Sequence, residues 1–593
     1  MALETEIKSG KLKMRLKSLR QELIRLKIDG FIIPRTDEHQ GEYVAPSSER
    51  LAWLTGFTGS AGVAIVLTGK AVLFIDGRYT LQAKAQVSED LITHYPLSTN
   101  SQAKWISENL KPNMKIGYDP WLMTPTQEIR YREACKISKA LLVPVAKNPI
   151  DVIWKNRPVP PSTPIIIHGI EFAGQSSDSK RTHIVELLQM EGSDAAILTA
   201  LDSIAWLLNI RGSDIPFSPL FEAFAIINND KSVELFLDKT KLTQSVEKHL
   251  GIDVRCHEQE FFAQAINNLK NKTVRLNLET APVYILRQLE NAGAKIQAGA
   301  DPCQLPKSIK SSAQLNGVRA AHLRDGASLT RFLAWLDANA TTETITEKSA
   351  AKTLESMRLN NKYYKGLSFP TISGSGSNGA IVHYSVNSKT DRNLEKGTLY
   401  LVDSGAQYLD GTTDVTRTIA IGTPTNSMIH HFTLVLKGHI AIAIAQFPKG
   451  TTGSQLDILA RRALWEEGLD YDHGTGHGVG HFLGVHEGPQ RISKVPSKIA
   501  LEPGMIISNE PGYYKTGSYG IRIENLVCVI AGRHLSFETL TLAPIDRRLI
   551  DIDIMEKKEI EWLNGYHARV CKELSPLVDE KTKSWLVNAT VAF

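Results

Sequence analysis

Five acidic and imidazole residues in the last third of the chain lie in apolar or glycine-rich surroundings, where charge is costly to bury. They are Asp403 after TLYLV, Asp414 in DGTTDVTRTIAIG, His477 in HGTGHGVGH, Glu510 after MIISN and Glu524 in GIRIENLVCVI. An ionised carboxylate in such a setting needs an opposite charge or a cation. Four converging acids would repel one another unless metal neutralised them. The pattern therefore predicts a metal centre.

The residue types also indicate the metal and its chemistry. Oxygen-rich sets with one imidazole suit hard or borderline divalent ions such as Mn²⁺, Co²⁺, Fe²⁺ or Zn²⁺. Four carboxylates are more than one such ion needs, so we expect two ions that share carboxylates and a water. Such a pair can lower the pKa of the water and clamp a tetrahedral intermediate, which is hydrolytic chemistry.

Each motif also has an ordinary structural interpretation. An Asp in a turn such as DGTTD is usually a turn former. The HGTGHGVGH run is more informative, because three histidines and four glycines in nine residues cannot form a packed helix face. Glycines there allow unusual dihedral angles and close backbone approach.

Together, the motifs VDSGAQYLDGTTDVTRT, HGTGHGVGH, VHEGP, SNEPGYY and GIRIEN resemble those of the pita-bread metallopeptidases, which include methionine aminopeptidase, prolidase and aminopeptidase P. The family order of ligands is matched by Asp403, Asp414, His477, Glu510 and Glu524. The long N-terminal region and the tail LTLAPIDRRLIDIDIMEKKEIEWLNGYHARV are similar to the three-domain, cytosolic type of aminopeptidase P. The resemblance implies Xaa-Pro exopeptidase activity on peptides with proline in second position, two Mn²⁺ ions and a homodimer.

The same resemblance assigns further residues. It implies that His383 and His486 contact substrate and stabilise the intermediate, and that His473 lies near the proline-side pocket. An ordinary surface or core histidine is the alternative for each. Arg78, in FIDGRY, is a candidate for substrate binding from the first domain, with a strand-edge surface charge as its alternative.

Two more residues are candidates for supporting the ligands. Arg522 is two positions before Glu524, so strand alternation puts both side chains on one face, where Arg522 can pair with Asp414 and orient it. Tyr514 is expected to form a hydrogen bond within the same shell of residues around the ligands.

The hypothesis for the mechanism is attack by a metal-bridging hydroxide on the carbonyl before proline. Glu510 takes the proton of the water and passes it to the proline nitrogen, which has no N–H of its own and must be protonated to leave. Two alternatives stay open. One is a prolidase restricted to Xaa-Pro dipeptides, and the other is a non-catalytic pita-bread protein that serves as a binding module.

The elements that must position these residues follow from periodicity and turns. Leu12, Leu16, Leu19, Leu23 and Leu26 form an apolar helical stripe. A short apolar strand, the stretch WLTG with the Gly-rich turn FTGSAG, and a strand–turn–strand unit follow. A similar order begins near residue 182, so LDSIAWLLNIRGSD echoes ERLAWLTGFTGS. We expect two related, creatinase-N-like α/β domains, although any two α/β units could share this pattern.

The prolines of NRPVPPSTP and a stretch near Pro306 mark the boundaries, and Ser311 or Ser312 can cap the helix that follows. The predicted fold class is α/β and α+β. The predicted domains are 1–160 and 161–310, both α/β, and a pita-bread catalytic domain, 311–593, whose C-terminal extension begins at about 532.

Composition and cysteine usage indicate which partners and which cellular compartment to expect. The 593 residues are 42% hydrophobic and 22% charged, with a net charge of +5 that gives no reason to expect a nucleic-acid or membrane partner. Five scattered cysteines without a CxxC pair fit a reducing compartment. The charged N-terminal helix has no apolar core typical of a signal peptide, so we expect a cytoplasmic protein.

Overall fold

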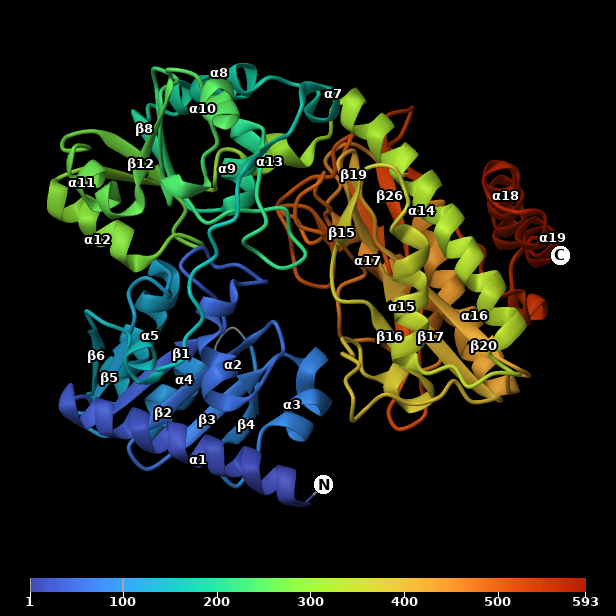
Figure 1. Ribbon diagram of the computed structural model, residues 1–593, viewed down its shortest axis with the longest axis horizontal. Helices are drawn as coiled ribbons and strands as arrows, with labels where there is room; N and C mark the ends of the chain where they lie inside the picture. The colour runs from blue at the N-terminus through green and yellow to red at the C-terminus, as the bar shows by residue number, and fades with distance from the viewer. Residues whose placement is uncertain (1, 99–100) are drawn as a thin grey trace. The chain divides into compact units, whose positions relative to one another are not determined.

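The computed structural model describes residues 2–98 and 101–593 (Figure 1). The chain divides into two compact units. Unit 1 contains residues 1–167, 176–216 and 220–303, and unit 2 contains 168–175, 217–219 and 304–593. Among the described residues, no helix combines the length and apolar character that a membrane crossing requires.

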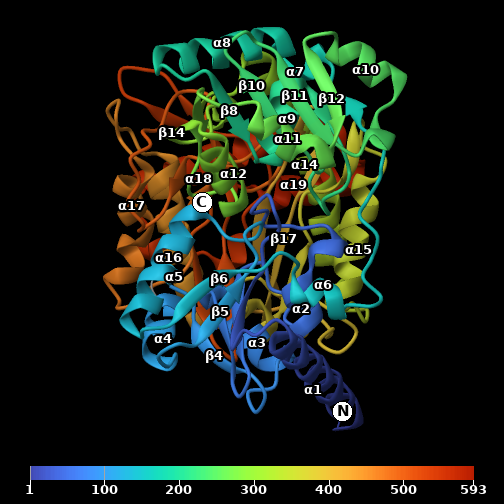
Figure 2. The ribbon, with the colours of Figure 1, turned by 90° about the vertical axis from the view of Figure 1, so that its left-hand side faces the viewer.

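Unit 1 holds two six-stranded sheets of the same design (Figure 2). The first has the strand order β4 (Thr93–Pro96), β3 (Ala71–Ile75), β2 (Gly62–Leu67), β1 (Gly30–Pro34), β5 (Lys115–Tyr118) and β6 (Leu141–Pro144). The second has β12 (Val254–Glu258), β11 (Val233–Leu237), β10 (Phe224–Asn228), β8 (Ala195–Leu198), β13 (Thr273–Leu276) and β14 (Lys295–Ala298).

The two sheets also agree in strand direction. In each, the three central strands are antiparallel and the outer ones are added in parallel. Helix α2 (Arg50–Thr55) carries RLAWLT, and α9 (Leu201–Leu208) carries its counterpart, LDSIAWLL. The strand–turn–strand predictions are confirmed at β2–β3 and β10–β11, and the two sheets match as the predicted repeat requires.

Apolar helix faces and one buried ion pair complete unit 1. Helix α1 (Ala2–Arg25) buries Leu12, Leu16, Leu19 and Leu23, so the predicted stripe is a core face. Asp214 and Lys241 form an ion pair with 2.6 Å between Oδ2 and Nζ, and their side chains are 0% and 2% exposed. This pair is fully internal, and each charge has its counter-charge beside it.

Unit 2 is built on the long helix α14 (Ser312–Asn339), which begins at the capping box of Ser311 and Gln314, as predicted. It also holds the helices α16 (Asn426–Ala443), α17 (Gly453–Trp465), α18 (Lys557–Leu574) and α19 (Glu580–Ala589). Two three-stranded sheets position the site. One has the order β16 (Ile372–Ser375), β17 (Thr398–Ser404), β20 (Val415–Ile421), and the other β23 (Ile506–Asn509), β26 (Asn525–Ile530), β27 (Ser536–Thr539).

Two short segments from the first half of the chain belong to unit 2. One contains α7 (Ile170–Ala173), where the Phe172 ring meets the edge of Tyr363 with 5.1 Å between centroids. In the other, the main-chain oxygen of Phe217 accepts a hydrogen bond of 3.1 Å from Gln407. No pattern in the sequence indicated that these segments join the catalytic half.

Candidate metal centre

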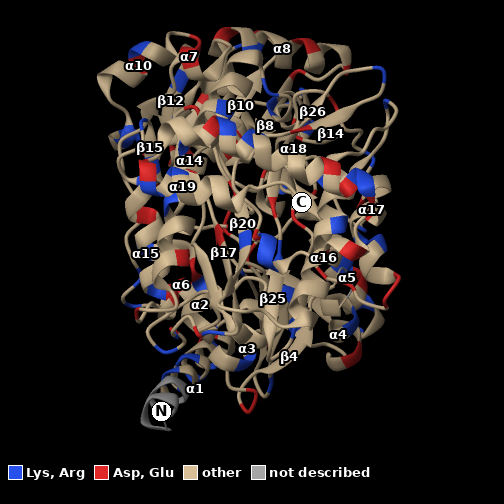
Figure 3. Ribbon diagram, turned by 90° about the vertical axis from the view of Figure 1, so that its right-hand side faces the viewer, with Lys and Arg blue, Asp and Glu red and all other residues tan. Residues whose placement is uncertain are grey.

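The five acid and imidazole residues occupy strands or strand ends of unit 2. Figure 3 marks acidic and basic positions on the ribbon around β17, β20 and β25 (Tyr519–Arg522). Asp403 lies on β17, and Asp414 directly precedes β20. His477 is on the short strand β21 (Gly476–His477), Glu510 follows β23, and Glu524 lies between β25 and β26. Strand pairing fixes their backbones, since Asp403 is opposite Thr416 and the Glu524 amide donates to the Thr416 oxygen.

Three of these side chains converge closely. Asp414, His477 and Glu524 each offer a ligand atom, and these atoms lie within 4.8 Å of one another. His477 Nε2 is 3.5 Å from Asp414 Oδ2 and 3.6 Å from Glu510 Oε1, so Glu510 adjoins the group. His477 Nδ1 donates to the main-chain oxygen of Gly478 at 3.0 Å, which leaves the lone pair of Nε2 for a metal.

Asp403 is linked to the cluster by Arg522. The distance from Arg522 Nη2 to Asp403 Oδ2 is 2.7 Å. The predicted pairing of Arg522 with Asp414 is therefore wrong, because the register of β17 brings Asp403 to the guanidinium. Arg522 also donates to the Tyr514 hydroxyl at 2.7 Å, so Tyr514 is hydrogen-bonded to the same guanidinium as Asp403.

Electrostatics favour a cation at this cluster. Burial, together with the Asp414 and Glu510 charges, raises the pKa of Asp403 to about 7 in spite of Arg522. Burial and the Asp414 and Asp403 charges raise the pKa of Glu524 well above its usual range, and burial also raises that of Glu510. Burial alone would lower the pKa of His477, but Asp414 and Glu510 raise it to about 9.

The polar atoms at the cluster fit a metal. In the described part of the chain, Asp403 Oδ1 and Asp414 Oδ1 are buried and accept no hydrogen bond. A buried acceptor without a partner costs about 1–3 kcal/mol. Divalent cations would supply both the missing partners and the missing positive charge.

Two hydroxyl residues that the sequence reading missed hold the ligands in place. Thr416 donates to Glu524 Oε2 at 2.7 Å and accepts from Arg522 Nε at 3.1 Å. Ser508 accepts from the His477 amide at 2.9 Å and donates to Glu510 Oε1 at 3.2 Å. Alternation along β20 could have revealed Thr416, since it is two residues after Asp414.

The predicted histidines lie near the ligands to different degrees. The exposed ring of His486 meets the edge of His477 with 4.3 Å between centroids. His473 Nε2 and the Tyr514 hydroxyl are 2.8 Å apart, so His473 joins the Arg522 network. His383 is partly exposed, and Arg522 donates at 3.4 Å to the main-chain oxygen of Val382 beside it.

The glycines beside His477 are required by close backbone approach. A Cβ at Gly476 would lie 1.9 Å from the Ser508 oxygen, and one at Gly478 would lie 2.1 Å from the Glu487 oxygen. The first approach brings the strands that carry His477 and Glu510 together, and the second brings the segment that follows His486 against the backbone beside His477.

Arg78 belongs to unit 1, in the short 3-10 helix η2 (Gly77–Tyr79). Its Nε is 2.8 Å from Asp76 Oδ1, and its side chain is partly exposed. Its nearest carboxylate partner is thus two residues away in the chain.

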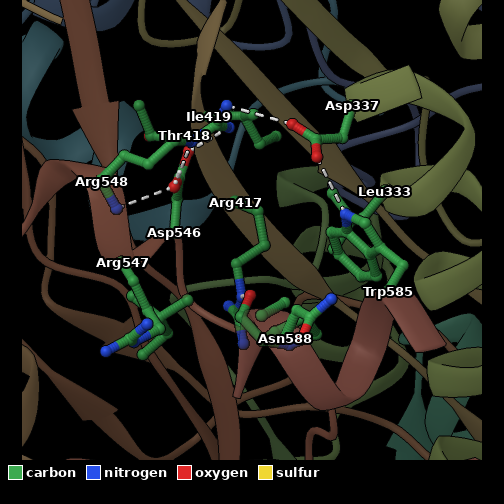
Figure 4. Close-up of a pocket in the computed structure, with 13 residues that line it drawn as sticks. Leu333, Asp337, Arg417, Thr418, Ile419, Asp546, Arg547, Arg548, Trp585 and Asn588 are labelled. Atoms are coloured by element: carbon green, nitrogen blue, oxygen red, sulfur yellow. Dashed lines mark hydrogen bonds and ion pairs between the residues drawn. The ribbon is translucent and has the colours of Figure 1, made fainter. Parts of the chain in front are cut away.

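A hollow of about 320 Å³ in unit 2 contains none of the five ligand candidates (Figure 4). It lies between β20 and α19, and Asp337 accepts there from Arg548 and from the Trp585 indole, both at 3.0 Å. Arg417 borders it and donates to main-chain oxygens of Glu524, Ala543 and Pro544. The hollow is thus separate from the acid cluster.

Comparison with family models agrees with this architecture along the chain. The model of metallopeptidase family M24 matches residues 316–531, and its C-terminal region matches 533–593. Two models of the creatinase/prolidase N-terminal domain match residues 15–157 and 156–314.

Similar proteins extend over the whole chain. A probable Xaa-Pro aminopeptidase P of Paracoccidioides brasiliensis is 40% identical, with 97% of this chain and 98% of the relative covered. One from Aspergillus fumigatus is also 40% identical, with 97% and 92% covered. The structure of X-prolyl aminopeptidase from Caenorhabditis elegans, described as a cytosolic enzyme with a di-nuclear active site, matches with a TM-score of 0.94 and 34% identity over 98% of this chain and 100% of that one. The chain therefore belongs to metallopeptidase family M24 and, within it, to the Xaa-Pro aminopeptidase P group.

Proposed function

We propose that this chain is a metal-dependent aminopeptidase that hydrolyses the bond between the first residue of a peptide and a proline in second position. The observation that carries the proposal is the convergence of Asp414, His477 and Glu524, with Glu510 and Asp403 adjoining, in a chain 40% identical to Xaa-Pro aminopeptidase P.

We propose Asp403, Asp414, His477, Glu510 and Glu524 as ligands of two divalent ions, with Mn²⁺ as the ions in use. When bound, the ions would lower the pKa of a shared water and polarise the scissile carbonyl. Arg522 and Tyr514 would orient the ligands, since Arg522 ties Asp403 to Tyr514 and to Thr416.

The chain's own groups then have distinct tasks. His383 and His486 would contact the substrate and donate to the developing oxyanion, for which one donor contributes about 3 kcal/mol. Glu510 would take a proton from the attacking water and deliver it to the proline nitrogen, which must be protonated to leave. His473 would border the proline side, and Arg78 would bind substrate from the first domain.

The chain's organisation is part of the proposal. We propose domains 1–160, 161–310 and 311–593, with the C-terminal extension from about 532, and the bounds of the matching family models support this division.

We further propose that the protein is a cytoplasmic homodimer. Helix α17 exposes Ile458, Leu459 and Trp465, which form an apolar surface suited to contact with a second copy of the chain. Trp465→Ala should shift the protein toward monomer in sedimentation velocity.

The first test follows peptide products by mass spectrometry after chelation and after addition of Mn²⁺. Expected is metal-dependent release of the first residue from Arg-Pro-Pro-type peptides, with loss of that release in Asp403→Ala. Glu510→Gln should abolish turnover and largely keep substrate affinity, and loss of affinity with turnover retained would refute its proton-transfer role.

The same assay separates the alternatives. Cleavage of Xaa-Pro dipeptides alone would indicate a prolidase. No cleavage with any divalent metal would indicate a binding module.

A further inference from the structure

Three charged side chains outside the acid cluster form a fully buried ion triad in unit 2. Lys307 Nζ is 3.1 Å from Glu487 Oε2, and Lys310 Nζ is 2.7 Å from Glu487 Oε1. The side chains of Lys307, Lys310 and Glu487 are 2%, 1% and 0% exposed. Each oxygen of the carboxylate therefore has an ammonium group within ion-pair distance, and Oε1 also accepts a hydrogen bond from Lys310.

The triad joins two distant stretches of chain. Lys307 lies in α13 (Gln304–Ser308), and Lys310 follows it, with its amide donating to the Gly504 oxygen. Lys310 Nζ also donates to the main-chain oxygen of Lys307 at 3.0 Å, which stiffens the segment. Glu487 is thus clamped by a segment that is itself bound to the strand region of the metal centre.

Burial of three charges is a poor route to stability. Desolvation costs several kcal/mol per ion, and well-packed apolar residues often do as well or better. In some proteins such a group instead serves to fix one geometry, because other arrangements would leave a buried charge without its counter-charge. The neighbours of Glu487 suggest what that geometry serves.

Glu487 follows His486 directly in the chain, and the two side chains differ in burial. Glu487 is buried, whereas His486 is exposed with its ring 4.3 Å from that of His477. The Glu487 amide donates to the Gly478 oxygen at 2.8 Å, and the Gly478 amide donates to the Gln490 oxygen at 3.1 Å. The backbone that presents His486 is therefore fixed at Glu487.

We propose that Lys307, Glu487 and Lys310 are positioning residues that hold the His486 imidazole at the place where it meets the substrate carbonyl. The inference rests on the proposed function of His486. Displacement of a catalytic group by about 1 Å can cost about 10²-fold in rate. Loss of the clamp should therefore lower kcat and leave the metal centre intact.

A double-mutant cycle tests this with Mn²⁺-loaded full-length protein and an Arg-Pro-Pro-type peptide. Glu487→Gln keeps the size of the side chain and removes its charge. We expect kcat to fall about 10–100-fold, with KM changed by less than about threefold. Mn²⁺ affinity, measured by calorimetry, should stay within about threefold of wild type. In a His486→Ala background the same change should lower kcat by no more than about twofold, because the group that it positions is gone.

The outcomes are distinct. Equal losses of kcat with and without His486, or a large fall in Mn²⁺ affinity, would overturn the positioning role. Lys307→Met, which leaves Glu487 paired with Lys310, repeats the cycle if Glu487→Gln does not fold. Glu538→Gln, which breaks the partly exposed pair with Arg319, is the matched control and should match wild type. Inactivity of wild type and of this control would refute the proposed function instead.

Discussion

Two buried charged groups in this chain differ in how their charges are balanced. In unit 1, Asp214 and Lys241 form a closed pair at 2.6 Å. In unit 2, four carboxylates and His477 crowd together, and Arg522 is the guanidinium that contacts one of them, Asp403. The pair is complete without any ligand, whereas the crowded acids have raised pKa values and need cations. The neutralised pair is thus typical of a structural role, whereas the excess of negative charge at the acid cluster is typical of a functional site.

The largest effect should come from the crowded group. Asp403→Ala removes a ligand candidate and leaves Arg522 without its carboxylate. We expect kcat/KM toward an Xaa-Pro peptide to fall by about 10⁴-fold or more. The urea midpoint of the metal-free protein should change little, because relief of the repulsion between Asp403 and the other acids offsets the loss of the ion pair with Arg522. Kinetics with added Mn²⁺ and urea unfolding measure both. A large fall in the urea midpoint with activity retained would mean that Asp403 serves stability rather than function.

The closed pair should respond in the opposite way. Lys241→Met leaves Asp214 buried without its partner, so the free energy of unfolding should fall by about 3–5 kcal/mol. Calorimetric Mn²⁺ binding should match wild type. The double variant Lys241→Met/Asp214→Leu should regain most of the stability, because no unpaired charge remains. If the double variant stays as unstable as Lys241→Met, the unpaired charge of Asp214 is not the cause of the lost stability.

Arg522 tests the link within the crowded group. Arg522→Lys keeps a positive charge but cannot reach Asp403, Tyr514 and Thr416 together. We expect Mn²⁺ affinity to fall about 10–100-fold in calorimetric titration. Thr416→Val, which removes only the hydroxyl between Arg522 and Glu524, should show a smaller fall. Unchanged affinity in both variants would mean that these contacts do not orient the ligands.

The smallest effect concerns a buried histidine outside both groups. The Nε2 of His567 accepts the Ile545 amide, and burial with the Arg417 and Arg547 charges lowers its pKa to about 3. The unfolded chain binds a proton there below about pH 6.5, whereas the folded chain does not until about pH 3. This contribution to stability is therefore present above pH 6.5 and is lost as the pH falls.

His567→Gln removes that titration. Between pH 6.5 and 5.5 its unfolding free energy should fall by about 1.0 kcal/mol less than that of wild type. Urea unfolding at several pH values measures the slope. Parallel pH profiles for the two proteins would contradict the assignment.

The sequence predicted the parts of the fold that depend on local pattern. The stripe of Leu12 to Leu23, the hairpins and the cap at Ser311 follow from spacing and turn chemistry. The repeated unit was visible because both copies keep the same order of elements. The membership of residues 168–175 in unit 2 was not predictable, because it depends on long-range packing.

The candidate site divides in the same way. The five ligand candidates stood out as charges in apolar runs. The partner of Arg522 did not, because the choice between Asp403 and Asp414 depends on strand register. Lys307 and Lys310, in PKSIK, look like ordinary surface lysines, and only the fold reveals that both are buried on Glu487.

Arg417 has a consequence for how the chain can be shortened. Arg417 lies on β20, which follows Asp414, and its buried guanidinium donates to the Glu524 oxygen and to Ala543, Pro544 and Tyr566 of the C-terminal extension. A chain cut near residue 532 would leave several of its N–H groups without acceptors inside the metal centre's own sheet. The extension and that sheet therefore form one cooperative folding unit, and an active fragment has to keep both.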